Sequence, residues 1–491
     1  MISFGFWNLI ILILVAWVLK NNWRLDDEQL AWKNSLFLKS SVIQQLIKFF
    51  RKPIVNFIVQ ASVVLVVTRF LCYTGWLIYF LNQPHPPFWD FQWYYVASKL
   101  AHQHLSPFNV EIFNQTFCTI TKVCGSLPPF VYPPNIIPLT WFLGDFSLNN
   151  AFKISIVMHI LAIGLALWGA NILLESKSRA LKTICTISVA LIYGLVRDFQ
   201  VGNIAIFITV LILWMFIWAR KNRDIPAGIC LGLALCKPTL AVLFILYFLL
   251  KKRFFLVFVS LLTVTFLALL GLGLTGNSLT QFLSDSTQGF SLWLKDPSVN
   301  PYISISRLDL MVVGPRLFPN NPFFAQLLSN IIVLILVSGV GRYLYLQQSF
   351  TAWSKKIYLA EIVLISCLSI SINYSQDTSS VMLIPAVVFL LNDLLYQIRH
   401  CKFSKKRMSV WLAGVCCVAM QTAVIHGWLI HSLAKHWKVK AGELPYFMKV
   451  TIFALPSYAV LGVTVSILVL AISSLRQKQI LKFESFNRVS I

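Results

Sequence analysis

Acidic side chains are scarce in this sequence, with only 17 Asp and Glu residues among 491. Charged residues of both signs make up 12% of the chain, whereas an ordinary soluble domain carries roughly 25%. This shortage of charge excludes a typical soluble globular domain. Hydrophobic residues make up 58%, and apolar runs long enough to cross a bilayer, about 20 residues each, recur along nearly the whole chain. The clearest runs are 54–81, 151–174, 202–219, 254–274, 323–346, 409–430 and 450–473.

The alternating ten-residue segments of an outer-membrane barrel are also missing. Because every backbone polar group needs a partner inside lipid, long uniform apolar runs must be helical. The sequence therefore predicts an all-α, polytopic integral membrane bundle of about 11 to 13 spans.

Recognisable cofactor and metal motifs are absent as well. There is no metal-ligand spacing, no Walker loop and no dinucleotide fingerprint, and the eight His residues are scattered. We expect neither a metal nor a bound cofactor. Most of the ten Cys residues lie in or beside apolar runs, but Cys118 and Cys124 share one polar loop and could pair or remain free.

Basic residues, by contrast, are abundant, and the net charge is +24. They cluster in short connectors between apolar runs rather than along a groove-reading motif, which argues against a nucleic-acid partner. The positive-inside rule predicts that these connectors are cytoplasmic. They lie at 20–52, 251–253, 399–407 and after residue 473.

These connectors suggest a domain organisation. Residues 1–53 read as a retained first span, rather than a secretory signal, followed by an amphipathic cytoplasmic connector. Residues 54–475 form the main transmembrane domain, and 476–491 form a cytoplasmic tail. Two long loops, 82–132 and 275–321, fall outside the cytoplasm.

The topology between residues 131 and 250 has two solutions. Counting single spans puts the basic connectors 177–182 and 220–223 outside, against the positive-inside rule. Alternatively, 133–146 is re-entrant and 225–250 breaks into two half-spans at Lys237, before a proline that removes a backbone hydrogen bond.

Asp90 is the most conspicuous carboxylate, because it lies among aromatic residues directly after an apolar run. In a helix that begins near Asp90, Tyr94 shares its face at i+4. Aromatic neighbours raise the basicity of a carboxylate, which suits a general base acting on a sugar hydroxyl. The alternative is that Asp90 only caps an interfacial helix.

Other polar residues interrupt the apolar pattern at four places. Three of them also have a structural explanation: a proline turn, a polar connector and a snorkelling lysine. Arg307 is the residue best suited to phosphate oxygens. The four places are Tyr132-Pro133-Pro134, Arg197-Asp198 with Gly202-Asn203, Lys237-Pro238, and Asn300 to Arg307.

In their order and spacing these motifs resemble glycosyltransferase family 87, of the C-type superfamily. The resemblance spans roughly residues 54–395 and includes a polar step at 373–377, although Gln376 replaces an aromatic residue of the family. The motifs that carry it are Asp90-x3-Tyr94, Ala97, Ser106-Pro107-Phe108, Tyr132-Pro133-Pro134, Gly202-Asn203, Lys237-Pro238 and Asn300…Ser304…Arg307.

The resemblance implies transfer of a hexose, mannose by analogy, from a polyprenyl-phosphate donor to an extracytoplasmic glycan or glycolipid, with inversion. Membrane lipid would surround the site, in a bacterial plasma membrane. Asp90 would be the single base. The expected substrate-binding residues are Tyr94, Trp93, Lys237, Arg307, Arg197, Asn203, Ser304, Gln376 and Asp377. A lipid or solute transporter, or a non-catalytic subunit of a glycan-assembly complex, remains the alternative.

Overall fold

The computed structural model describes residues 89–124, 130–174, 179–190, 192–296, 299–302, 304, 307–348, 355–400, 405–421 and 455–489. Within residues 86–396 and 403–491 they form one compact unit. The predicted first span and connector (1–53), the predicted span 54–81 and the predicted outside loop 431–449 lie outside the described residues.

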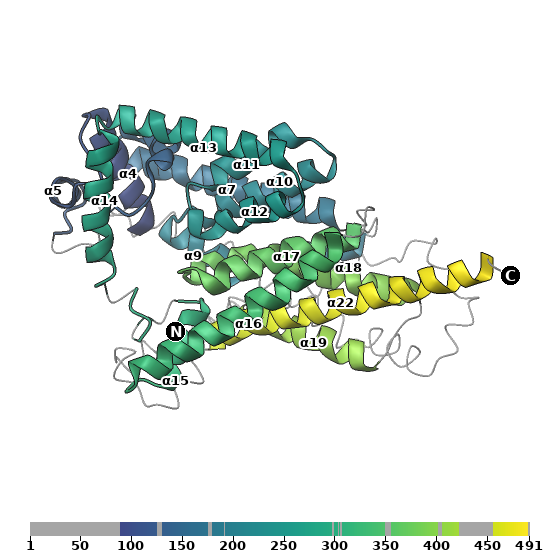
Figure 1. Cartoon of the computed structure of the whole chain (residues 1–491). Coiled ribbons are helices and arrows are strands. Elements are labelled where there is room, and N and C mark those ends of the chain that lie inside the picture. The colour runs from purple at the N-terminus through teal and green to yellow at the C-terminus, as the bar shows by residue number, and fades with distance from the viewer. Residues whose placement is uncertain are drawn as a thin grey trace, which may run out of the picture. The chain divides into compact units, whose positions relative to one another are not determined.

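The described residues fold into α-helices and short 3-10 turns, with one isolated antiparallel bridge between Arg307 and Gln376 (Figure 1). This confirms the all-α prediction. Five helices are long and apolar enough to cross a membrane by length and composition. They are α7 (Leu148–Leu173), α13 (Phe254–Leu274), α16 (Pro322–Gln348), α18 (Ile384–His400) with the 3-10 helix η6 (Asp377–Leu383) before it, and α22 (Leu455–Val489).

The long helices turn much of their apolar surface outward. On α13, Phe258 is 60% and Phe266 64% exposed, and on α16 Leu334 is 65% exposed. A protein in water would bury such side chains, whereas a lipid-facing helix surface presents them to acyl chains. The protein is an integral membrane protein.

The apolar run 225–250 is broken into two short helices. Helix α11 (Asp224–Ala234) ends before Lys237, and α12 (Pro238–Leu250) begins with a proline at its first position, which needs no amide hydrogen bond. Residues 133–146 are likewise divided, into η3 (Pro134–Ile136), α6 (Ile137–Thr140) and η4 (Trp141–Asp145). Both features agree with the second topology, in which 133–146 is re-entrant and 225–250 forms two half-spans.

Two basic turns meet at one end of the helices, which we call the basic end. The Arg253 side chain donates to Ala219 O at 3.2 Å and to Asn222 Oδ1 at 3.3 Å, and it pairs with Asp224. The turn after α10 (Ala205–Arg220) therefore lies beside the turn between α12 and α13. Since single-span counting would put these turns on opposite sides of the membrane, that solution is wrong.

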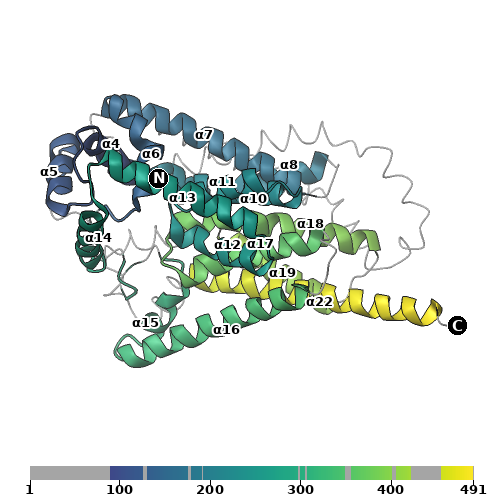
Figure 2. The ribbon, with the colours of Figure 1, turned by 45° about the horizontal axis from the view of Figure 1, so that its top comes forward.

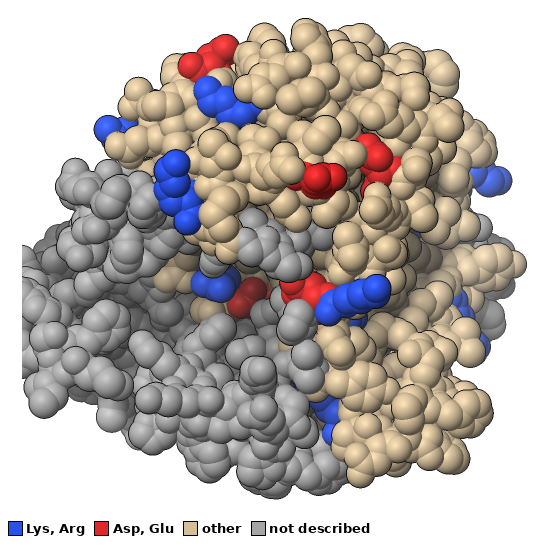
Figure 3. All heavy atoms as spheres, turned by 90° about the vertical axis from the view of Figure 1, so that its left-hand side faces the viewer, with Lys and Arg blue, Asp and Glu red and all other residues tan. Residues whose placement is uncertain are grey.

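The opposite end, which we call the site end, carries α4 (Trp89–His102), α5 (Val110–Thr121) and α14 (Leu279–Trp293). These helices lie together at the left of Figures 1 and 2, beyond one end of α7 and α13. Seen from that side in Figure 3, acidic and basic side chains lie next to one another near the middle of the view.

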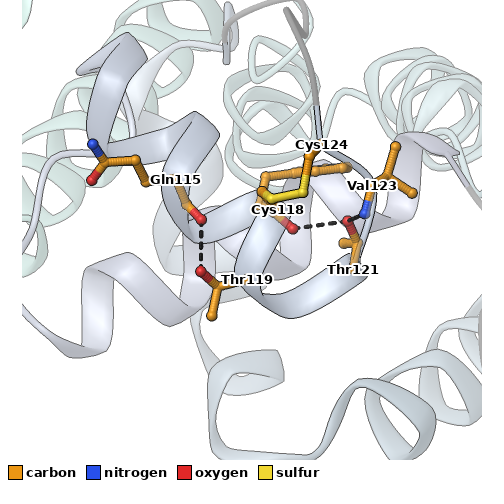
Figure 4. The surroundings of a disulfide bond; sticks show 7 residues. Gln115, Cys118, Thr119, Thr121, Val123 and Cys124 are labelled. Carbon is orange, nitrogen blue, oxygen red and sulfur yellow. Dashed lines mark hydrogen bonds between the residues drawn. A yellow bond between two sulfur atoms is a disulfide. The ribbon is translucent and has the colours of Figure 1, made fainter.

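Cys118 and Cys124 form a disulfide at the end of α5 (Figure 4). The helix stops at Lys122, whose φ of 61° is left-handed, and the Val123 amide donates to Thr121 Oγ1 at 3.2 Å. The bond closes this tight turn back onto the last turn of α5, so the pairing that the sequence left open is present.

Candidate functional site

Asp90 lies in the first turn of α4 and contacts a residue far along the chain. Its Oδ2 atom accepts a hydrogen bond from Asn203 Nδ2 at 2.5 Å. The two residues are 113 positions apart, so this contact is tertiary rather than a local helix cap. Asp90 as a whole residue is half-buried.

Asn203 is held by the junction between α9 (Tyr193–Val201) and α10. Helix α9 ends at Gly202, whose φ of 68° is a left-handed conformation that glycine adopts without strain. The Asp198 carboxylate accepts from the Ala205 and Ile206 amides, both at 3.1 Å. Asp198 thus stabilises the start of α10 and fixes the short segment that carries Asn203.

Lys237 reaches the same asparagine from the break between α11 and α12. Its Nζ atom donates to Asn203 Oδ1 at 2.8 Å. Because the proline that follows ends the first half-helix there, the ammonium lies at the interruption instead of within a continuous helix. The side chains of Asp90, Asn203 and Lys237 are therefore linked in that order by hydrogen bonds.

Arg197 and Asp377 form a second charged pair near these three side chains. Arg197 Nε is 3.6 Å from Asp377 Oδ2; the arginine side chain is 36% exposed and the carboxylate is buried. Helix α9 lies against η6 at Gly194, where a Cβ atom would come within 2.3 Å of Ser380 Oγ. Only glycine allows this approach, which sets Arg197 opposite Asp377.

Arg307 is held differently from what its predicted phosphate role suggests. Its Nε and Nη2 atoms donate to the two Asp309 carboxylate oxygens at 2.9 and 2.6 Å, and its guanidinium lies 5.1 Å from the Tyr374 ring centroid. Gln376, which bridges to Arg307, donates to Tyr374 Oη at 2.6 Å. The carbonyl of Ser304 accepts from Arg316 at 2.7 Å. Arg307 thus organises the loop around Tyr374.

The predicted aromatic residues point in two directions. Tyr94 is buried and packs against Tyr132, with ring centroids 5.0 Å apart. Trp93 instead stacks on Phe113 and Phe117 of α5, with centroids 5.1 Å apart in each case. Tyr94 and Tyr132 therefore line the Asp90 side of α4, whereas Trp93 anchors α5.

Burial raises the pKa of Asp90 above its ordinary value. The Asn203 hydrogen bond and the charges of Lys237 and Arg197 oppose this shift, and the charge of Asp377 adds to it. A carboxylate with a raised pKa is a stronger base than a free aspartate. The geometry can therefore accept a proton at Asp90 beside two cationic side chains.

The structure thus brings Asp90, Tyr94, Asn203, Lys237, Arg197 and Asp377 into one region. Sequence reasoning missed Asp198 as an anchor, and it missed His159, whose Nε2 lies 2.9 Å from Asn203 O. A histidine inside the apolar run of α7 was the available signal, because polar residues at membrane depth tend to mark function. Among the described residues, no group of three or more His, Cys, Asp or Glu side chains could hold a metal.

The model of glycosyltransferase family 87 matches residues 130–369. This part of the chain belongs to that family. Asn203, Lys237, Arg197 and Arg307 lie within the matched residues, and Asp90 precedes them. No curated protein and no solved structure matches the chain. The family match indicates a glycosyltransferase.

Proposed function

We propose that this protein transfers a hexose, mannose by family analogy, from a polyprenyl-phosphate donor to a hydroxyl of a glycan or glycolipid, with inversion. The observation that carries the proposal is the state of Asp90. The residue is half-buried, burial raises the pKa of its carboxyl group, and the carboxylate is bonded to an amide rather than directly to a cation.

In the proposed reaction the acceptor oxygen attacks the anomeric carbon from the face opposite the phosphate. The bond from that carbon to the phosphate oxygen breaks, and its electron pair leaves with the polyprenyl phosphate. The hydroxyl proton passes to Asp90. Because a phosphate leaves without being protonated, one base suffices, and no second carboxylate at about 5 Å, as in retaining glycosidases, is required.

Lys237 and Arg197 are the proposed partners of the donor phosphate. Each influences the ionisation of Asp90, and the Arg197 side chain is 36% exposed. Cations aimed at a leaving phosphate stabilise the charge that develops on it. The Arg307 guanidinium donates to Asp309, so in this proposal Arg307 shapes the loop at Tyr374 and Gln376 and does not bind phosphate. Ser304 belongs to the same structural part of the loop. Metal or cofactor chemistry is not part of the proposal.

The site end is assigned to the extracytoplasmic side and the basic end to the cytoplasm. The turns tied together by Arg253 carry the cations that the positive-inside rule places in the cytoplasm. A lipid-linked donor in the outer leaflet of a bacterial plasma membrane would then reach Asp90 laterally.

The test is transfer from labelled polyprenyl-phosphate sugars by purified protein in lipid. Asp90→Asn should lower kcat by about 10²- to 10⁴-fold, the usual contribution of a general base. The matched control is Asp145→Asn, which makes the same change at an exposed carboxylate of η4 and should leave kcat unchanged. Equal transfer by wild type and Asp90→Asn would remove Asp90 from the role. Absence of transfer from every donor, with uptake in vesicles, would favour a transporter; absence of both would favour a non-catalytic subunit.

A further inference from the structure

Asn203 uses every polar atom that it has. It is 3% exposed, and backbone and side chain alike are engaged with groups from four helices and the break before α12. A side chain so fully bonded has little left to offer a substrate. The backbone N–H of Asn203 donates to Asp198 O at 3.0 Å, and its backbone carbonyl lies 2.9 Å from His159 Nε2. Its side-chain Oδ1 accepts from Ala205 N at 3.0 Å and from Lys237 Nζ at 2.8 Å, and its Nδ2 donates to Asp90 Oδ2 at 2.5 Å.

We propose that Asn203 is a positioning residue, which orients the Asp90 carboxylate and links it to the charge of Lys237 through the side-chain amide. The inference rests on the proposed role of Asp90 as the base. It gives Asn203 a function that does not involve touching the substrate.

The direction of the amide is determined by its neighbours. Oδ1 receives two N–H donors, from Ala205 and Lys237, so Nδ2 must face Asp90. A flipped amide would bring its oxygen against the carboxylate and its NH2 group against the ammonium. Both contacts would be repulsive, and the side chain therefore has one favourable orientation.

This arrangement separates the base from the nearest cation by one amide. A hydrogen bond to the ionised carboxylate favours that form, and Lys237 polarises the amide that donates it. A direct ion pair with Lys237 would instead lower the basicity of Asp90 more strongly. The amide thus supports an ionised base without neutralising it.

Two variants of similar size test the inference. Asn203→Asp replaces the donor by an oxygen facing Asp90, and Asn203→Leu removes all side-chain hydrogen bonds. On the acidic side of the pH profile, kcat/KM falls as Asp90 becomes protonated; we call this part of the profile the acid limb. In both variants the acid limb should shift to higher pH by about one unit or more, because the ionised Asp90 loses its hydrogen-bond donor. The charged and titratable groups that influence or are influenced by Asp90 stay in place: Lys237, Arg197, Asp377, Asp198, Tyr94, Tyr132 and Tyr374.

Asn109→Asp is the matched control. It adds the same charge at the N-cap of α5, where an aspartate accepts the Glu111 and Ile112 amides as asparagine does. Its acid limb should coincide with that of wild type. A folded Asn203→Asp protein, eluting as wild type does, with an unshifted acid limb would overturn the inference.

A second readout does not depend on turnover. Infrared difference spectra of wild type and Asn203→Leu, each referenced to its Asp90→Asn counterpart, report the titration of the Asp90 carboxyl band. An upward shift in Asn203→Leu supports the inference even if no donor is turned over, and an unchanged titration refutes it. Loss of transfer in Asp90→Asn together with unshifted Asn203 variants would leave the proposed function intact and remove the positioning role alone.

Discussion

The two ends of the helices differ in how a lysine meets a carboxylate. At the basic end carboxylates meet cations directly: Lys251 Nζ is 2.5 Å from Glu361 Oε1, and Arg253 pairs with Asp224. At the site end Asp90 and Lys237 are joined through the amide of Asn203. Both ends remove charge from lipid, but the Asp90 carboxylate, unlike that of Glu361, has no direct lysine partner.

The difference separates structural from chemical use of charge. A short pair in which both side chains are buried, such as Lys251–Glu361, neutralises both groups, so neither can take part in proton transfer or bind an anion without leaving the other unpaired. The Arg197–Asp377 contact at the site end is looser, at 3.6 Å, and leaves the Arg197 side chain 36% exposed. An amide between the two charges weakens their attraction and leaves each available. Ion pairs alone would therefore be a poor guide to the reactive end of this protein.

The largest expected contrast lies between two lysines. Lys237→Met should lower kcat/KM by about 10²- to 10³-fold, because a group that stabilises transition-state charge is lost. Lys251→Met should leave kcat/KM of the folded protein within about twofold, since its partner Glu361 belongs to the basic end. Steady-state assays of both variants in lipid decide the matter. Similar losses in kcat/KM would erase the distinction between the ends.

Stability should respond in the reverse order. Lys251→Met strands the buried Glu361, which also accepts from Tyr247 Oη at 2.7 Å, and should cost about 3 kcal/mol of unfolding free energy. Denaturation in mild detergent would report it as a lowered melting temperature. The double variant Lys251→Met/Glu361→Leu should recover most of the loss, because no unpaired charge remains. If the double variant does not regain stability, the Lys251–Glu361 pair contributes more than the neutralisation of two buried charges.

The disulfide gives a smaller test, within the site end. Replacing Cys118 and Cys124 by serine opens a loop with a sequence separation of 6 and should cost about 2 kcal/mol through a less restricted unfolded chain. Asp90 lies on α4, outside that loop, so transfer by the folded variant should stay within a few-fold. A collapse of kcat at unchanged melting temperature would make the α5 turn part of the chemistry.

The smallest expected effect is a displacement of the wild-type pH profile. Burial raises the pKa of Asp90, and the base works only when ionised, so activity should fall as pH drops through that raised value. The acid limb of kcat/KM should therefore lie above the ordinary aspartate value of about 3.9. The limb should disappear from the residual activity of Asp90→Asn. A limb at the value of a free aspartate would contradict the desolvated base.

Helices were well predicted where composition alone decides them. The bounds of α13 coincide with the predicted run 254–274, because a continuous apolar stretch has no other way to satisfy its backbone in lipid. For residues 225–250, by contrast, the sequence allowed both one continuous span and two half-spans that break at Lys237. A proline permits a kinked continuous span as well as two half-helices, and packing against other elements selects between them.

The site was predicted less completely than the fold. Asp90 and Lys237 stood out as charges in apolar surroundings, but nothing local indicated that Asn203 would join them or that Trp93 would turn toward α5. Likewise, nothing in the sequence indicated that Asp309 would accept hydrogen bonds from Nε and Nη2 of Arg307, or that Val299 O would accept one from Nη1. Spacing along a helix indicates which residues share a face, but it does not indicate which other helix that face packs against.

The sequence by itself determined the membrane class, the helical architecture and the prominence of Asp90, because the cost of exposing backbone or charge to lipid acts locally along the chain. Only the tertiary structure decided that Asp90 meets the side-chain amide of Asn203 before a cation, and that Asp198 and His159 hold the backbone of Asn203 in place. The contacts of Asp90 and His159 with Asn203 join residues that lie far apart along the chain, and they arise from packing that no local pattern encodes.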